Sequence, residues 1–194
     1  MNDRDLHAHL INQQGSRKSL NTPVLLIDLD AFERNIASMA AFAAAHHLRL
    51  RPHAKTHKCA EIARRQVAAG AVGVCCAKLG EAEEMGAGGI DSILITSPVV
   101  SPQAIARLVK LNDQISDLQV ATDNIDNVKA LAAATTGKPL KVLIDIDPGI
   151  RRTGVASAEA AVAAQGHLPF RDWLVQQTIS SAEGAVSTAG EKPA

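Results

Sequence analysis

The run Arg51-Pro52-His53-Ala54-Lys55-Thr56-His57-Lys58 has the residue types of a nucleophilic lysine site. A lysine amine condenses with an aldehyde to a Schiff base only when it is unprotonated, and burial or neighbouring cations favour that form. Lys55 lies just past a predicted strand, with two histidines, an arginine and a second lysine within four residues. The run predicts Lys55 as a covalent nucleophile. The alternatives are a basic loop facing solvent and a phosphate-binding patch without covalent chemistry.

The elements that must position this run form a βα series between Thr22 and Thr153, where short apolar runs alternate with helical patterns. The predicted strands are residues 24–29, 48–52, 72–76, 92–96, 118–122 and 140–147. Helices are predicted at 59–69, 80–86, 102–112 and 124–134. A further helix follows the first strand, with Asp30 as its N-cap. One face of that helix should pack on a sheet, and it carries Phe32, Ile36, Met39, Ala40 and Ala43.

This spacing fits a (β/α) barrel at least as well as an open doubly wound sheet, so the fold class is α/β. In either fold, ligands bind at the carboxyl ends of the strands. The segments expected there are Lys55 with its neighbours, 76–78, 96–97, 122–123 and 147–154. A barrel has eight strands and only five or six are predicted. We therefore expect an incomplete barrel whose open edges need cover from another chain, a homodimer being one arrangement that provides it.

Composition narrows the cellular compartment and the classes of binding partner. The 194 residues carry 20 basic and 20 acidic side chains, so no net charge draws the chain to nucleic acid or to an anionic membrane. The polar segment 1–20 does not resemble a signal peptide, and no apolar run approaches the roughly 20 residues that span a bilayer. Three cysteines do not make a disulfide framework. We expect a cytoplasmic protein in which Cys75 and Cys76 are buried thiols.

Four segments together resemble the D-threonine aldolase and metal-dependent D-serine dehydratase family. They are Thr22-Pro23-Val24-Leu25-Leu26-Ile27-Asp28-Leu29-Asp30 with Asn35, the run 51–58, Gly73-Val74-Cys75-Cys76-Ala77-Lys78-Leu79-Gly80-Glu81-Ala82-Glu83, and Asp147-Pro148-Gly149-Ile150-Arg151-Arg152-Thr153-Gly154. The second and third are long and specific. The resemblance implies a fold-type III enzyme that depends on pyridoxal phosphate (PLP), with a partial TIM barrel of the alanine racemase N-terminal type.

The resemblance also implies roles for particular residues. The first lysine of the family's His-x-Lys-Thr-His-Lys motif binds the cofactor, and it corresponds to Lys55. His53, Thr56 and His57 are expected to be catalytic residues lining the reacting bond. Arg152 is expected to bind the cofactor, with an ordinary surface or capping arginine as the alternative. The divalent metal expected in full-length relatives has its ligands elsewhere, so no residue is assigned to metal. Asp145 and Asp147 are interpreted as structural residues. Glu81 lies at the start of a predicted helix, where the helix dipole favours a negative charge, so it needs no role in the active site.

The resemblance divides the chain into three parts. Residues 1–21 form an N-terminal arm, 22–164 a partial PLP-binding barrel with a last helix from 155 to 164, and 165–194 a divergent tail expected to be poorly ordered. Family members resembling this chain continue with a tyrosine-bearing segment, a glycine-rich phosphate site and a metal-binding β domain. Because this sequence shows none of them, we expect the 194-residue chain to be a fragment with little or no activity.

Three functions remain open at this point. A D-threonine aldolase cleaves D-3-hydroxy amino acids to glycine and an aldehyde, whereas a D-serine dehydratase converts D-serine to pyruvate and ammonia. Nothing before Gly154 separates these two lyases, and in both the partner is a small D-amino acid. The third is a non-catalytic protein. It is either a PLP-binding protein with the same barrel or, as the exposed strand edges suggest, a partner-binding or degenerate remnant.

Overall fold

The computed structural model describes residues 6–165, so the tail expected at 165–194 lies outside the described residues except for Gln165. The chain separates into two compact units, Met1–Met39 and Ala40–Ala194. The first contains the short 3₁₀ segments η1 (Ala8–Leu10) and η2 (Ser16–Ser19), and helix α2 (Leu29–Ala45) begins in it. Among the described helices, none is long and apolar enough to cross a membrane.

Two predictions for the first unit are wrong. Residues 24–29 form no strand, because this apolar run has no ladder partner among residues 6–165, and Leu25 is 99% exposed. The cap of α2 is Asp28 rather than Asp30, since its carboxylate accepts a hydrogen bond from the Ala31 amide at 2.9 Å. The predicted apolar face of α2 is only partly buried, with Ala43 buried and Met39 52% exposed.

The second unit is built around four parallel strands in the order β1-β2-β3-β4, namely Val74–Cys76, Ser92–Ile95, Asp117–Thr122 and Lys141–Ile144. Each strand is joined to the next through a helix, α4 (Leu79–Ala87), α5 (Pro102–Gln114) or α6 (Ile125–Ala134). Sequential order around one sheet is the winding of a barrel and not of a doubly wound sheet. The prediction of an α/β fold with barrel-type topology is confirmed.

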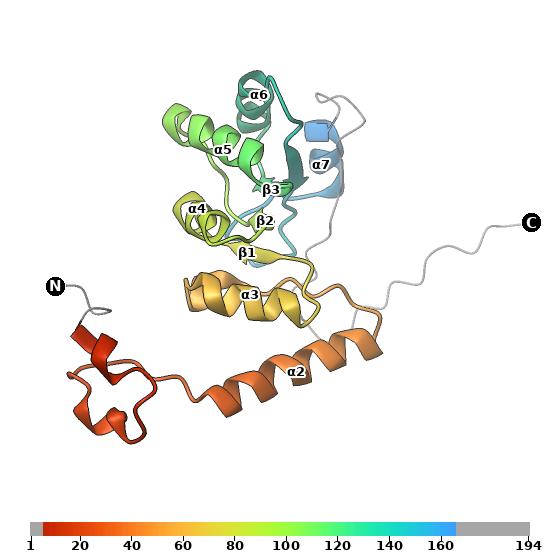
Figure 1. Cartoon of the computed structure of the whole chain (residues 1–194). Helices are drawn as coiled ribbons and strands as arrows, with labels where there is room; N and C mark the ends of the chain where they lie inside the picture. The colour runs from red at the N-terminus through yellow and green to blue at the C-terminus, as the bar shows by residue number, and fades with distance from the viewer. Residues whose placement is uncertain (1–5, 166–194) are drawn as a thin grey trace, which may run out of the picture. The chain divides into compact units, whose positions relative to one another are not determined.

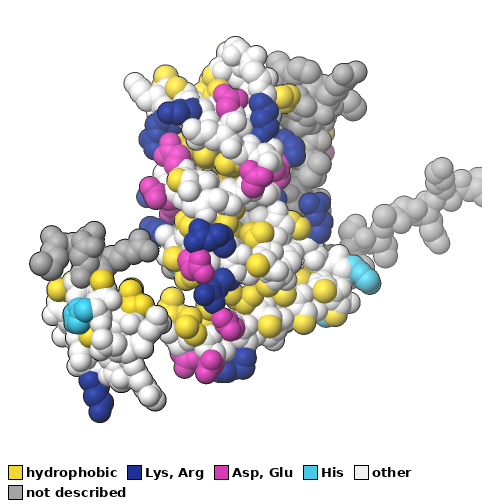
Figure 2. Space-filling model, in the orientation of Figure 1, with side chains coloured by type: hydrophobic (Ala, Val, Ile, Leu, Met, Phe, Trp, Pro, Cys, Tyr) yellow, Lys and Arg dark blue, Asp and Glu magenta, His cyan; other side chains and the backbone are white. Residues whose placement is uncertain are grey.

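Helices α3 (Ala60–Ala68) to α6 follow one another along one side of this sheet, each packed on the next (Figure 1). Ser101 caps α5 and Asn124 caps α6, and these two helices begin within one residue of their predicted starts at 102 and 124. The last described helix, α7 (Ala158–Gln165), begins three residues after the predicted start at 155. On the surface shown in Figure 2, acidic and basic side chains are interspersed, consistent with the zero net charge.

The predicted strand at 48–52 is present only as an edge segment, 50–53, beside β1. The Leu50 carbonyl accepts a hydrogen bond from the Val72 amide at 2.9 Å, and the Pro52 carbonyl accepts one from Cys75 at 2.8 Å. His53 continues the contact as a single parallel bridge to Cys75. Pro52 has no amide hydrogen to give, which interrupts a regular ladder at this position.

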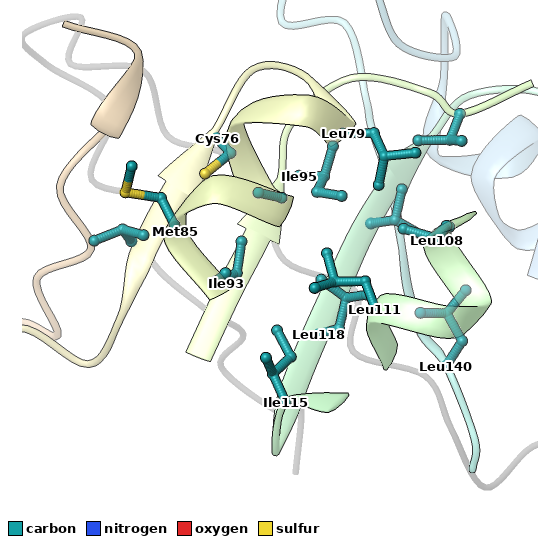
Figure 3. Packing of buried hydrophobic residues seen from close by; sticks show 14 of the residues in the cluster. Cys76, Leu79, Met85, Ile93, Ile95, Leu108, Leu111, Ile115, Leu118 and Leu140 are labelled. Atoms are coloured by element: carbon teal, nitrogen blue, oxygen red, sulfur yellow. The ribbon is translucent and has the colours of Figure 1, made fainter. Parts of the chain in front are cut away.

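The core lies between the sheet and the helices. Every second strand residue faces the helices, so that Ile93 and Ile95 of β2 pack with Leu108 and Leu111 of α5 (Figure 3). Apolar burial of this kind is the main favourable term in folding. Gly73, immediately before β1, has a φ of 142°, and a methyl group there would overlap the Ser92 carbonyl oxygen.

The opposite face of the sheet has a layer of charge at the amino ends of the strands. Asp117 is its centre, since its carboxylate accepts hydrogen bonds from Lys141 Nζ at 2.6 Å and Ser92 Oγ at 2.6 Å. Gln119 donates a third at 2.9 Å, and the Arg51 guanidinium lies 3.6 Å away. Burial alone would raise the pKa of Asp117, but these hydrogen bonds and the Lys141 charge outweigh it and lower the pKa to about 2.

This lowered pKa predicts acid sensitivity of the sheet. The folded chain holds the Asp117 proton less tightly than the unfolded chain, whose ordinary value is 3.8, so the carboxylate stabilises the fold above pH 3.8. That contribution should be lost as the pH falls from 3.8 towards about 2. In urea unfolding at several pH values, Asp117→Asn should be less stable than wild type at neutral pH and should lose less stability on acidification. Asp113→Asn, at an exposed position on α5, is the control. Parallel stability profiles for wild type and Asp117→Asn would contradict the prediction.

Candidate functional site

Lys55 lies at the carboxyl edge of the sheet, where ligands bind in this topology. It occupies the middle of a short 3₁₀ turn, η3 (Ala54–Thr56), directly after the His53–Cys75 bridge. Its side chain is exposed. Within residues 6–165 no carboxylate pairs with its ammonium group, which leaves the amine accessible to an incoming molecule.

The second lysine of the run is held differently. Lys58 adopts a left-handed backbone conformation with a φ of 49°, and its Nζ lies 3.6 Å from a carboxylate oxygen of Glu81. The other oxygen of Glu81 accepts a hydrogen bond from the Ala77 amide at 2.9 Å. Burial would raise the pKa of Glu81, but the Ala77 amide and the Lys58 charge lower it overall. Glu81 therefore ties the Lys55 loop to the start of α4, a contact that helix-dipole reasoning from the sequence missed.

The ring of His53 connects the loop to the end of β2. Its Nδ1 accepts a hydrogen bond from the Lys55 backbone amide at 3.3 Å, and its Nε2 lies 3.3 Å from Thr96 Oγ1 at the end of β2. Burial lowers the pKa of His53, and the positive charge of Lys55 lowers it further. Thr96 was expected at this edge only as part of the segment 96–97, and its contact with His53 was not predicted.

Thr56 and His57 make hydrogen bonds to residues close to them in sequence. The Thr56 hydroxyl donates to the His53 carbonyl at 3.1 Å, and His57 Nδ1 accepts from the Cys59 amide at 3.1 Å. Nε2 of His57 is buried without a hydrogen bond, as is Oε1 of Gln66 on α3. Burial lowers the pKa of His57, while Gln66 is near enough to act in the opposite direction. The structure thus brings His53 and Lys55 together and places the His57 ring beside α3.

Arg152 lies in the loop after β4, is exposed, and has no hydrogen bond or ion pair within residues 6–165. The loop itself is ordered by Asp147, whose carboxylate accepts from the Gly149 amide at 2.9 Å and from the Arg151 amide at 2.9 Å. These bonds lower the pKa of Asp147, and they give it the structural role expected from the sequence. In the described residues no three His, Cys, Asp or Glu side chains gather as a metal site.

The cysteines have the properties of packing residues. Cys76 is inaccessible on β1 and belongs to the core cluster, and burial raises its pKa to about 12. Cys75 is half-buried, with its pKa raised by burial, and its thiol donates weakly to the Arg51 carbonyl at 3.7 Å. A nucleophilic cysteine needs a stabilised thiolate, and both thiols have the opposite tendency.

The site can be tested against PLP, the cofactor that the sequence resemblance implies. Covalent attachment needs a lysine whose amine is reachable and uncommitted. Lys55 meets this requirement, whereas Lys58 is engaged with Glu81. The exposed lysine at the carboxyl edge of the sheet therefore fits the attachment point of the cofactor.

Comparisons with known proteins agree with this fold. Residues 27–174 match the family model of the alanine racemase N-terminal domain. The chain is 38% identical over 174 residues to the 3-hydroxy-D-aspartate aldolase of Paracoccus denitrificans, covering 85% of this chain and 45% of that protein. It is 36% identical to the D-threo-3-hydroxyaspartate dehydratase of Delftia sp. (strain HT23), over 74% of this chain and 38% of that one.

A solved structure also matches this fold. The crystal structure of D-threonine aldolase from Filomicrobium marinum superposes with a TM-score of 0.73 at 43% sequence identity, covering 76% of this chain and 41% of that one. The chain therefore spans less than half the length of the relatives that it matches. With most of its length matched to the family model, the chain belongs to the alanine racemase N-terminal domain family.

Proposed function

We propose that this chain carries the cofactor lysine, Lys55, of a PLP-dependent lyase that acts on D-3-hydroxy amino acids. The observation that supports it most directly is the exposed, unpaired side chain of Lys55 at the carboxyl edge of a barrel-type sheet. When bound, PLP supplies an aldehyde for the lysine and a ring that draws electrons from the substrate. The chain's own residues orient the lysine and hold the loop that carries it.

Each loop residue has a proposed part in this task. His53, bonded to the Lys55 amide, sets the direction of the 3₁₀ turn. Lys58 and Glu81 fix the far end of the loop on α4, so that the loop is held on both sides of Lys55. Thr56 and His57 are proposed to line the reacting bond, and Arg152 to contact the cofactor from the loop after β4. We propose 22–164 as the cofactor-binding part and 1–21 as an arm, in a cytoplasmic homodimer.

The substrate class rests on what the relatives share. Their names specify 3-hydroxy-D-aspartate, D-threo-3-hydroxyaspartate and D-threonine. All three are D-amino acids with a hydroxyl group on the carbon next to Cα. Of the reactions named, we favour aldol cleavage to glycine and an aldehyde, since the D-threonine aldolase structure matches at 43% identity. The alternatives are dehydration, as in the Delftia relative, and PLP binding without catalysis.

The cofactor part of the proposal predicts lysine-dependent binding. Purified chain titrated with PLP should develop the visible absorption of a lysine-bound cofactor, and Lys55→Ala should abolish it because no other amine of the loop is uncommitted. Lys110→Ala, which removes an exposed lysine on α5, should leave the absorption unchanged. Equal absorption in wild type and Lys55→Ala would refute the assignment.

The substrate part predicts stereochemical preference. Adding D-threonine to PLP-loaded protein should change the cofactor absorption, whereas L-threonine at the same concentration should not. The reason is that the fixed loop accepts only one arrangement of the substituents at Cα. Products are then measured after prolonged incubation. Glycine with acetaldehyde supports the aldolase, and a 2-oxo acid with ammonia supports the dehydratase. An identical spectral response to both enantiomers would contradict the proposed substrate class.

A further inference from the structure

We propose that Thr96 is a positioning residue that fixes the tautomer of His53 and thereby the loop that presents Lys55. The inference rests on the proposed function only in taking Lys55 as the cofactor lysine. It concerns a contact across 43 positions of sequence, between the end of β2 and the run that precedes β1.

The assignment follows from which groups can donate. A backbone amide has only a hydrogen to give, so the contact at 3.3 Å between the Lys55 amide and His53 Nδ1 requires a lone pair on Nδ1. A neutral imidazole with an unprotonated Nδ1 carries its hydrogen on Nε2. That hydrogen points to Thr96 Oγ1, 3.3 Å away, where a hydroxyl lone pair accepts it.

Thr96 is the last side chain in this series of hydrogen bonds. A hydroxyl has a single hydrogen, and Thr96 Oγ1 lies 3.2 Å from the Cys76 carbonyl, which can only accept. The order is therefore Lys55 amide to His53 Nδ1, His53 Nε2 to Thr96 Oγ1, and Thr96 hydroxyl to the Cys76 carbonyl. In this order each of the three hydrogens has one acceptor. The Thr96 amide also donates to the Cys76 carbonyl, at 2.9 Å, which anchors Thr96 on β1.

The surroundings favour this neutral form of the ring. A protonated imidazole would carry a hydrogen on Nδ1 and direct it at the Lys55 amide hydrogen. Burial and the Lys55 charge lower the pKa of His53, while the Glu81 carboxylate and the Cys75 backbone act in the opposite direction. Both ring nitrogens of His53 then take part in hydrogen bonds, which fixes the orientation of the ring beside Lys55.

The tautomer is tested directly by nitrogen-15 NMR of the histidine rings of the cofactor-free 194-residue chain, with His53→Gln identifying the His53 signals. Wild type and Thr96→Ser should show Nε2 protonated and Nδ1 unprotonated at neutral pH. Thr96→Val, which keeps the shape but removes the hydroxyl, should increase the Nδ1-protonated form. Thr135→Val is the matched control, because the Thr135 hydroxyl caps the Leu131 carbonyl at the end of α6. A wild-type ring protonated on Nδ1, or an unchanged tautomer in Thr96→Val, would overturn the proposal.

A second readout measures the effect on Lys55. Loss of the Thr96 hydroxyl should weaken PLP binding by roughly two- to tenfold, as expected for one hydrogen bond, and Thr96→Ser should restore it. Wild-type affinity in Thr96→Val would overturn the link to Lys55. If wild type binds no PLP, the proposed function is wrong. The NMR experiment on the cofactor-free chain still tests the His53 tautomer independently.

Discussion

Two backbone hydrogen bonds between the 50–53 segment and the β1 region determine where the candidate site lies. The amides of Val72 and Cys75 donate to the carbonyls of Leu50 and Pro52, at 2.9 and 2.8 Å. This pairing places the chain after His53 at the carboxyl edge of the parallel sheet, beside the ends of β1 and β2. Without it, the 3₁₀ turn that carries Lys55 would have no fixed position relative to Thr96 or Glu81.

The two faces of the sheet have different roles. The helix side provides the apolar core, and the other face carries the candidate site. The helix side is filled by apolar residues and excludes water, which supports the strands. The other face carries two groups of polar residues, one at each end of the strands. At the amino ends, Asp117 gathers Ser92, Gln119 and Lys141, whereas at the carboxyl ends His53 and Thr96 meet beside Lys55. The group around Asp117 stabilises the sheet at the end opposite to the one that would bind a ligand.

Much of the fold follows from local sequence pattern. The strands predicted at 92–96 and 118–122 and the helices predicted after them agree with the structure to within about two residues, because alternation and helical periodicity depend on neighbours in sequence. The segment 24–29 has equal β propensity but no strand, because a ladder requires a partner, which local pattern does not reveal. Likewise Asp28 caps α2 instead of Asp30, a shift of two residues that propensity alone does not resolve.

The candidate site was predictable in its centre and not in its supports. Residue types alone left a basic loop or a phosphate-binding patch open, and the resemblance of the run 51–58 to a family motif indicated Lys55. The structure places that side chain at the carboxyl edge of the sheet. The contacts of His53 with Thr96 and of Lys58 with Glu81 join residues distant in sequence, so they depend on strand order and register. His57 has the same residue type as His53, yet its ring lies beside α3, which the alternating sequence does not distinguish.

Lys55 is the residue to which we propose that PLP attaches. Borohydride reduction of the PLP-loaded chain makes the lysine linkage permanent, and peptide mass analysis then locates it. We expect the pyridoxyl mass on the peptide containing Lys55, with fragment ions placing it on that residue and leaving Lys58 unmodified. A label on Lys58, a label spread over surface lysines, or no label would contradict it.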